Sequence, residues 1–496
     1  MKNIIASVND IVWGAPALVL ILGVGLYLTV RLGFVQLTLF PEAFRLFLRQ
    51  LVPGKGSSSF QALCTALAAT VGTGNLVGVA GAICLGGPGA VFWMWVCGML
   101  GMVTKYAEAL LAVRYRVKTP AGFAGGPMYI ITQALPRKLH VLAYVYAAFG
   151  FLAAFGVGNA TQINAALTGI REACRVYRLD MPPLGNLVIT SLLAGITGLL
   201  LFGGAKRIGT AAERLVPFAA AGYILLCIGV LCLRWRQLPQ AFGMILEGAF
   251  SPRAVTGGMI GSSFRTLRIG CSRGVFTNEA GMGTASIAHA GAEGVHPARQ
   301  GMMGIMEVFL DTIVICTMTA LVILVSGVPI PYGVDAGGEL TTAAFSNLYG
   351  GSAALLLAAA CVLFAVATVL GWGLYGARCA EFLFGASVWH FFAALQVITV
   401  FAASFLETGI LWQLAEAVNG LMAIPNLIML ALLAPEAARL TKEYRKSGES
   451  KAGGGNYADF HQCKPLRALS HAEIPSSGSQ GQAGRQKNLS SEYRSA

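Results

Sequence analysis

The sequence predicts an all-α polytopic membrane protein, and composition carries much of this prediction. Of the 496 residues, 56% are hydrophobic and 11% are charged, whereas a soluble domain carries about 25% charged residues. The mean hydropathy is +0.67. The 62 glycines fit the same class, because small residues let transmembrane helices approach each other closely. Apolar segments of about 20 residues, the length that spans a bilayer, recur along the whole chain.

We place eleven spans along the chain. When the first is set aside, the other ten divide into five and five, and each half opens with a long span that contains a polar interruption. An odd number of spans in each half gives the halves opposite orientations, so the count predicts an inverted repeat. The predicted spans lie near residues 11–30, 60–85, 88–113, 141–168, 186–202, 212–233, 257–291, 302–327, 352–376, 388–405 and 409–433.

These spans predict four regions. An N-terminal helix and cytoplasmic loop occupy residues 1–59, the two five-helix repeats occupy residues 60–233 and 257–433, and a polar tail occupies residues 442–496. The tail is rich in Gly, Ser, Lys and Arg and is predicted to be disordered, because it cannot bury enough apolar surface to offset the entropy of ordering.

Charge predicts the orientation of the chain. The net charge is +13, and the basic residues lie mainly in alternate loops and in the tail. The positive-inside rule then places the N-terminus outside and the C-terminus in the cytoplasm. We therefore attribute the positive charge to the orientation of the chain in a bacterial inner membrane, and we expect no nucleic-acid partner. We also expect no obligate protein partner. The eleven cysteines form no CxxC pair, so no zinc site or disulfide framework is indicated.

The first interruption, Gly72-Thr73-Gly74-Asn75, is a candidate binding site. Unwound backbone at membrane depth survives only where it is buried in protein or lines a cavity. The half-helix before it ends in partially negative carbonyls, and the half-helix after it begins with partially positive N–H groups. A sodium ion can bind the first end, and an amino-acid carboxylate can bind the second. Gly74 would let the backbone approach the ligand, although Gly74 with Gly78 also forms a GxxxG packing pattern.

The second interruption, residues 278–283, contains Glu279. Ionisable residues inside a membrane are costly and often functional, but we favour a structural role for Glu279, paired with Arg273 or Arg268. The carbonyls of residues 276–278 are the better candidates for binding a substrate ammonium. Phe276, Met282 and Trp372 would then restrict the pocket to small side chains.

Each of four further polar residues on apolar spans has more than one possible role. Gln162 either forms a hydrogen bond between helices or contacts substrate. Thr368 lies on one face with Trp372 and either bonds its own backbone or completes a sodium shell. Asp311 and Glu108 could titrate, but we expect them near the membrane interface or in ion pairs.

Several longer motifs resemble the alanine or glycine:cation symporter family, also called sodium:alanine symporters. The resemblance covers residues 11 to about 440 and excludes the tail. It is carried by the runs at residues 71–80, 86–95, 105–108, 126–129, 277–281 and 287–290, and by Gly371-Trp372 with Tyr375-Gly376.

The resemblance implies a leucine-transporter-like fold with five plus five inverted helices behind one extra N-terminal helix. It implies sodium-driven uptake of alanine or glycine, with no organic cofactor. By similarity the substrate would contact seven residues, and sodium would lie between the carbonyls of Ala69 or Gly72 and the hydroxyl of Thr368. The substrate residues are Thr73, Gly74, Asn75, Gln162, Phe276, Gly281 and Trp372.

Two positions depart from the family pattern. Ala367 stands where a second hydroxyl is more usual, and Ala377 stands where Glu is more usual. Either change could weaken the sodium shell or alter coupling. A proton-coupled carrier that uses Glu279 or Asp311 is the nearest alternative function, and a channel or a membrane enzyme is more distant. The sequence offers no nucleophile beside a base, which argues against an enzyme.

Overall fold

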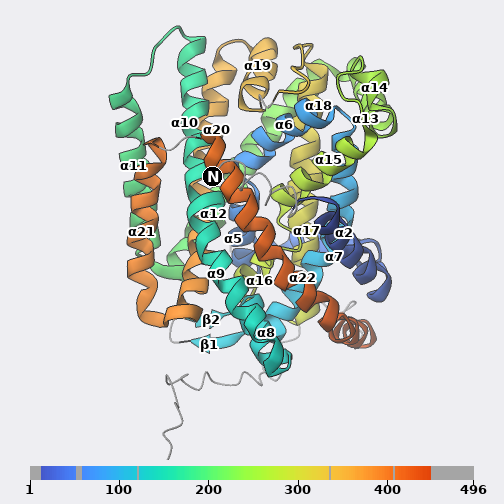
Figure 1. Ribbon diagram of the computed structural model, residues 1–496, viewed down its shortest axis with the longest axis vertical. Coiled ribbons are helices and arrows are strands. Elements are labelled where there is room, and N and C mark those ends of the chain that lie inside the picture. Colours follow the sequence, from blue (N-terminus) through green and yellow to red (C-terminus); the bar gives the residue numbers. More distant parts are fainter. Residues whose placement is uncertain (1–12, 52–57, 120–121, 335–336, 406–407, 448–496) are drawn as a thin grey trace, which may run out of the picture.

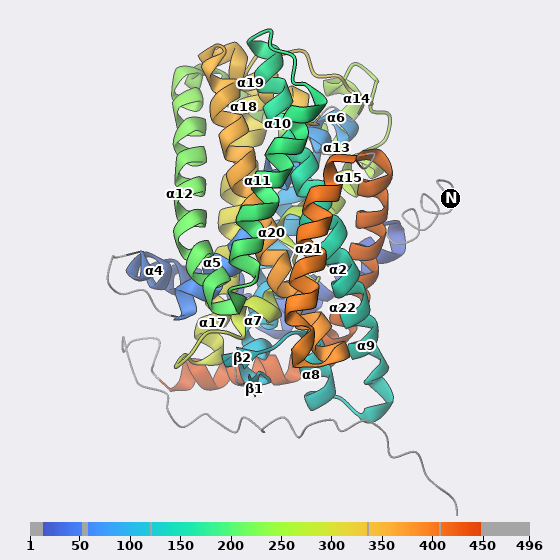
Figure 2. The ribbon, with the colours of Figure 1, turned by 90° about the vertical axis from the view of Figure 1, so that its left-hand side faces the viewer.

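The computed structural model describes residues 13–51, 58–119, 122–334, 337–405 and 408–447. These residues are almost entirely helical (Figures 1 and 2). The α-helices are α2 (Ala15–Arg31), α3 (Val35–Thr38), α4 (Phe40–Gln50), α5 (Ser58–Thr70), α6 (Val77–Gly86), α7 (Ala90–Arg114), α8 (Pro127–Ala134), α9 (Val141–Phe155), α10 (Thr161–Val176), α11 (Pro183–Leu201), α12 (Gly204–Leu233), α13 (Leu238–Phe250), α14 (Pro252–Val255), α15 (Ser263–Asn278), α16 (Thr284–His289), α17 (Pro297–Val308), α18 (Thr317–Val325), α19 (Gly337–Tyr349), α20 (Ser352–Phe384), α21 (Trp389–Ala402) and α22 (Thr408–Lys446).

Short helical turns and one hairpin complete the described chain. The turns are η1 (Thr73–Asn75), η2 (Arg137–Leu139), η3 (Gly156–Ala160), η4 (Trp235–Gln237), η5 (Phe309–Cys316), η6 (Ala386–Val388) and η7 (Ala403–Phe405). Strand β1 (Val117–Thr119) pairs antiparallel with β2 (Gly122–Ala124).

The described helices are those of a multi-pass membrane protein. Seven are long and apolar enough to cross a membrane, and the bent pair α5 and α6 makes an eighth span. Two shorter apolar helices cover residues 16–31 and 386–402. Helix α12 presents large apolar side chains outward, among them Phe218 and Leu225, as a helix that faces lipid does. The count of eleven spans stays a prediction.

The two predicted interruptions are breaks in helices. Helices α5 and α6 meet at an angle of 56° across residues 71–72 and the turn η1. Helix α15 ends at Asn278 and α16 begins at Thr284. The two broken helices pack crosswise, because α5 contacts α16 and α6 contacts α15. Figure 1 shows α6 and α15 in the upper half of the molecule and α5 and α16 below them. The breaks therefore lie in the middle of the helix bundle.

Helices packed around the breaks hold them in place. Helix α7 packs against α17, α10 and α9 against α20, and α11 against α21. The pair α11 and α21 forms one edge of the molecule in Figure 1. Two of the surrounding helices contain π-helical turns, η3 between α9 and α10 and η5 between α17 and α18. Single π-helical turns are frequent at functional sites.

The C-terminal helix extends further than the sequence predicts. Helix α22 continues to Lys446, so the first five residues of the predicted tail, 442–446, are helical. The hydroxyl of Tyr444 donates to the Glu42 carboxylate at 2.5 Å, which fastens the end of α22 to α4. Residues 448–496 of the predicted tail lie outside the described residues.

Candidate functional site

The side chain of Asn75 holds the first break in shape. The backbone N–H of Gly72 donates to Asn75 Oδ1 at 2.9 Å, and the backbone N–H of Asn75 donates to the Gly72 carbonyl at 3.2 Å. This reciprocal pair caps the turn η1 at both ends, so the break keeps a defined shape without a helical hydrogen-bond ladder. Thr73 and Asn75 are fully buried.

Two oxygen atoms without hydrogen-bond partners among the described residues lie at the C-terminal end of α5. Thr368 Oγ1 on α20 is buried and has no partner among the described residues. A methyl group built on Gly72 would lie 2.5 Å from that hydroxyl, so Gly72 and Thr368 are in direct contact. The carbonyl of Ala69, in the last turn of α5, accepts no hydrogen bond within the described chain. These oxygens are the hard, uncharged ligands that suit a sodium ion at the C-terminal end of a half-helix.

Hydrogen-bond donors without partners lie on the other side of the same break. Within the described chain, the backbone amides of Thr73 and Gly74 donate no hydrogen bond. Buried amides are nearly always paired, so these two are available to a ligand. The Thr73 hydroxyl donates to Gln162 Oε1 at 2.7 Å, and Gln162 Nε2 donates to the Val157 carbonyl at 3.1 Å. Gln162 thus links the first break to the π-helical turn η3.

The close approach of the Gly74 backbone to a substrate stays a prediction. The φ of Gly74 does not lie in the left-handed region, which favours glycine. A methyl group built on Gly74 would meet the Thr277 methyl at 3.5 Å and the Phe276 ring at 3.8 Å, which are ordinary contacts. In this break the residue without room for a side chain is Gly72, because Thr368 lies against it.

The second break is held by a buried carboxylate from another helix. Glu108 Oε1 accepts from the Gly281 amide at 3.0 Å, from the Gly283 amide at 3.2 Å and from Asn426 Nδ2 at 2.8 Å. Asn426 also donates to the Gly281 carbonyl at 2.9 Å. Gly281 and Gly283 have φ of +88° and +80°, a region that favours glycine. Glu108 and Asn426 therefore fix the unwound backbone, and both polar backbone groups of Gly281 are engaged in this scaffold.

Glu279 holds Trp372. Its Oε1 accepts from Trp372 Nε1 at 2.8 Å, and its Oε2 accepts from the Thr284 hydroxyl at 2.7 Å. The residue has φ of 53°, which is rare for a residue with a side chain and is typical of functional or tightly held positions. The structural role we favoured for Glu279 agrees with these contacts, but the expected arginine partners are wrong. Arg273 pairs with Glu416 at 3.3 Å and Arg268 donates to the Trp13 carbonyl at 3.3 Å.

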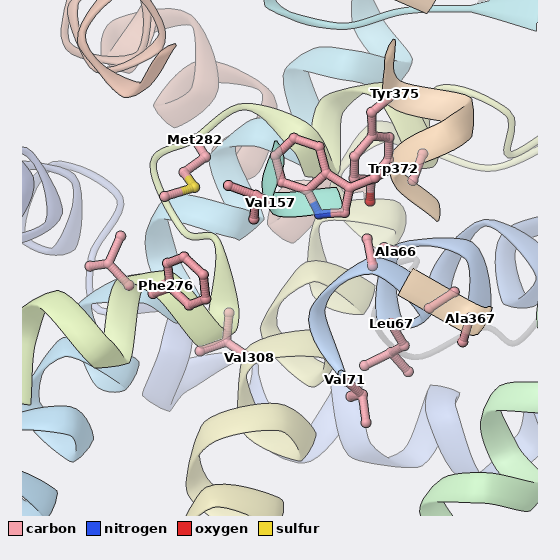
Figure 3. Packing of buried hydrophobic residues seen from close by; sticks show 14 of the residues in the cluster. Ala66, Leu67, Val71, Val157, Phe276, Met282, Val308, Ala367, Trp372 and Tyr375 are labelled. Atoms are coloured by element: carbon pink, nitrogen blue, oxygen red, sulfur yellow. The ribbon is translucent and has the colours of Figure 1, made fainter. Parts of the chain in front are cut away.

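Aromatic and apolar side chains lie around the region between the breaks. Figure 3 shows Phe276 and Met282 on one side of this region and Trp372 with Tyr375 on the other. Trp372 packs against η3, because a methyl group built on Gly158 would overlap its side chain. Near Phe276, the carbonyls of Thr277 and Asn278 at the end of α15 accept no hydrogen bond from another described residue.

Asp311 and Glu108 do not lie where we expected them. Both are fully buried, and neither forms a salt bridge with another described residue. Asp311 Oδ1 accepts from Asn75 Nδ2 at 2.6 Å, and Oδ2 accepts from the Thr312 hydroxyl at 2.8 Å. The prediction of an interfacial or ion-paired position is wrong for both residues, because the bundle folds them inward onto the two breaks.

A second buried network, which includes His289 of α16, was not predicted from the sequence. Glu307 binds Lys105 Nζ at 2.7 Å and His289 Nε2 at 3.2 Å, and all three side chains are fully buried. His289 Nδ1 forms a hydrogen bond with Gln300 Nε2 at 2.6 Å, and the Ser59 hydroxyl donates to Gln300 Oε1 at 2.6 Å. No sequence signal joins residues so far apart. The network ties α7, α17, α16 and α5 together.

The two departures from the family pattern are both buried on α20. Ala367 lies next to Thr368 and adds no side-chain oxygen to that region. Ala377 likewise offers no polar group there.

Comparisons with known proteins agree on one family. The model of the sodium:alanine symporter family matches residues 1–457. The chain is 41% identical to the sodium/alanine symporter AgcS of Methanococcus maripaludis over 91% of this chain and 98% of that protein. It is 38% identical to the amino-acid carrier protein AlsT of Bacillus subtilis over 90% of this chain and 92% of that protein.

A solved structure supports the fold. The structure of MhsT in complex with L-phenylalanine, a leucine-transporter-like fold, superposes with a TM-score of 0.53 and covers 77% of this chain and 97% of that one. The sequence identity is 13%, so this likeness concerns the fold alone. The match to the family model and the identity to its relatives show that this chain belongs to the sodium:alanine symporter family, a family of membrane transporters.

Proposed function

We propose that this protein is a sodium-coupled symporter that imports a small neutral amino acid, alanine or glycine, by alternating access. The observation that carries the proposal is the set of unpartnered buried groups at the first break. Thr368 Oγ1 and the Ala69 carbonyl can bind a cation, and the amides of Thr73 and Gly74 can bind an anion. A sodium ion and an amino-acid carboxylate satisfy both sets at once.

The proposed substrate site joins both breaks. The carboxylate binds at Thr73, Gly74 and Asn75, with Gln162 positioned by Thr73. The ammonium binds the free carbonyls at the end of α15, after Phe276. Trp372 and Phe276 enclose a pocket for a small side chain. Gly281 shapes the second break beneath the substrate, since its backbone is held by Glu108 and Asn426.

The proposed ion site consists of Ala69, Gly72 and Thr368. The Gly72 carbonyl already accepts one hydrogen bond from Asn75 and has a second lone pair for sodium. Because the shell shares Gly72 with the turn that binds substrate, filling the ion site would shape the substrate site. This sharing supports coupling of the two.

The arrangement of the helices supports an inverted repeat of five plus five spans behind α2. Helices at matching positions in the two halves pack together, namely α7 with α17, α10 with α20 and α11 with α21. The crosswise packing of α5 with α16 and of α6 with α15 is what two antiparallel broken helices produce. We propose eleven spans, with the N-terminus outside and the C-terminus in the cytoplasm.

Uptake of radiolabelled alanine into proteoliposomes tests the proposal. An inward sodium gradient should drive accumulation, and a potassium gradient of equal size should not. Thr368→Ala should raise the sodium concentration for half-maximal uptake by roughly 5- to 150-fold, the equivalent of about 1 to 3 kcal/mol for a lost buried ligand. Thr368→Ser keeps the hydroxyl and is the matched control. Equal uptake in both gradients, or an unchanged sodium dependence in Thr368→Ala, would overturn the coupling or the ion site respectively.

A further inference from the structure

We propose that Asp311 is a proton-binding site, so that a proton enters the cell with each amino acid in addition to sodium. The inference rests on the proposed function, since it needs a substrate carboxylate at the first break. It concerns a residue outside the proposed sodium shell of Ala69, Gly72 and Thr368.

Asp311 connects the two breaks through a short chain of hydrogen bonds. Its Oδ1 accepts from Asn75 Nδ2 of the first break at 2.6 Å. Its Oδ2 meets the Thr312 hydroxyl at 2.8 Å, and that hydroxyl accepts from Asn278 Nδ2, at the edge of the second break, at 3.1 Å. Any movement that separates the breaks must stretch this chain.

No described residue forms a salt bridge with the Asp311 carboxyl. The charged side chains that act on it most strongly are Lys105 of α7 and Glu307 of α17, and these bind each other at 2.7 Å. The turn η1 and helix α15 present the neutral amides of Asn75 and Asn278, and the nearby Cys316 thiol contacts Asn75. An ionised carboxylate buried among neutral groups is costly. A cation must therefore accompany Asp311 for at least part of the transport cycle.

The orientation of the two amides favours a proton over a metal ion. Asn75 Oδ1 is held by the Gly72 amide at 2.9 Å, and Asn278 Oδ1 by the Ala280 amide at 2.9 Å. Both side chains therefore turn their NH₂ groups, not their oxygens, toward the Asp311–Thr312 pair. A sodium ion needs oxygen ligands and would face these amide hydrogens.

A proton fits the existing contacts. It forms an O–H bond at Asp311 Oδ2, and this group donates to Thr312 Oγ1 in place of accepting from it. A hydroxyl can donate or accept and can accept two hydrogen bonds, so the 2.8 Å contact and the bond from Asn278 survive in both states. The proton is taken up outside and released inside, and no other bond is made or broken.

Substrate binding and proton binding would favour each other. The substrate carboxylate is proposed to bind the amides of Thr73 and Gly74, next to Asn75, and ionised Asp311 lies on the far side of the Asn75 amide. Two anions so close in a buried site repel each other. Alanine should therefore bind better when Asp311 is protonated, and by thermodynamic reciprocity bound alanine should favour protonation.

The test measures protons and alanine in the same vesicles. The full chain is reconstituted with a lumenal pH-sensitive dye, the membrane potential is clamped with potassium and valinomycin, and radiolabelled alanine is driven in by sodium. For the wild type we expect lumenal acidification of about one proton per alanine. For Asp311→Asn the ratio should fall to zero at whatever rate remains, because the new amide can donate permanently to Thr312. Glu381→Gln, which changes a carboxylate paired with Arg378 at 2.7 Å, is the control and should keep the wild-type ratio.

Binding measurements test the proton site even if Asp311→Asn transports nothing. In detergent, alanine affinity of the wild type should fall as pH rises, because binding takes up a proton, and Asp311→Asn should lose this dependence. Thr312→Ser should behave as the wild type, and Thr312→Val should weaken the pH dependence.

The outcomes separate this proposal from the proposed function. Sodium-driven alanine uptake by the wild type without acidification would overturn the proton site alone. Two sodium ions per alanine without acidification would overturn it in favour of a second metal ion. Acidification that persists in Asp311→Asn would place the proton elsewhere. Alanine uptake without sodium dependence would instead contradict the proposed function.

Discussion

The two breaks are stabilised in opposite ways. In the first, Asn75 caps its own turn, and the amides of Thr73 and Gly74 and the hydroxyl of Thr368 stay unpartnered within the described chain. In the second, Glu108 and Asn426 bind the backbone of Gly281 and Gly283 from two other helices. The first break therefore has free groups for ligands, while the second is a fixed support. An unwound membrane helix can therefore be a binding surface or a scaffold, depending on which groups form hydrogen bonds with its backbone.

Removal of the scaffold should have the largest effect. Glu108→Ala would leave two buried amides and the Asn426 side chain without their acceptor, at a cost of about 1 to 3 kcal/mol for each group left unpaired. We expect a large drop in the thermal unfolding midpoint in detergent. Glu443→Ala, which loses an exposed pair with Arg439, should cost less than about 1 kcal/mol. Equal midpoints for the two variants would contradict the scaffold role.

Gly72→Ala tests the close approach in the first break. The added methyl would lie 2.5 Å from Thr368 Oγ1 and would displace the proposed ion oxygen, with an overpacking cost of about 1 to 3 kcal/mol. We expect a rise of roughly 10- to 100-fold in the sodium concentration for half-maximal alanine uptake, with a normal unfolding midpoint when sodium is absent. A normal sodium dependence would remove Gly72 from the ion site.

Trp372→Phe tests how the second break limits the pocket. The change removes the indole N–H that binds Glu279 at 2.8 Å and leaves a smaller ring. Because one methylene in an apolar pocket is worth about 1 to 3 kcal/mol, leucine should compete with alanine at least about fivefold better than in the wild type. Trp389→Phe is the control, since its N–H binds the Leu201 carbonyl away from the breaks. If leucine already competes as well as alanine in the wild type, the small pocket is wrong.

Gly74→Ala should have the smallest effect in this set. The added methyl meets only ordinary contacts with Thr277 and Phe276, and no left-handed backbone is required. We expect an unchanged sodium dependence and a change in alanine affinity of less than about tenfold, below roughly 1.4 kcal/mol. Comparison with Gly72→Ala distinguishes the roles of the two glycines in the first break. A loss in Gly74→Ala that equals the loss in Gly72→Ala would show that the whole turn, not one contact, excludes side chains.

Local sequence signals found the breaks but not their partners. Glycine-rich polar runs within apolar segments identified Gly72 to Asn75 and residues 278–283, because backbone in lipid has few ways to be satisfied. The same rule could not say which groups satisfy it. Asn426 lies 145 residues from Gly281, and nothing in the run around Asn426 signals a link to the second break.

Hydropathy, helix-breaking residues and motifs are local properties of the chain, so they were enough to predict the class of the protein, the positions of both breaks and the family. The roles of the buried acids depend instead on tertiary packing. Glu108, Glu279 and Asp311 look alike in sequence, yet the first receives three N–H groups, the second holds an indole and the third joins both breaks through neutral groups. A carboxylate takes its role from the donors and charges that packing places around it, and those come from helices distant in the chain.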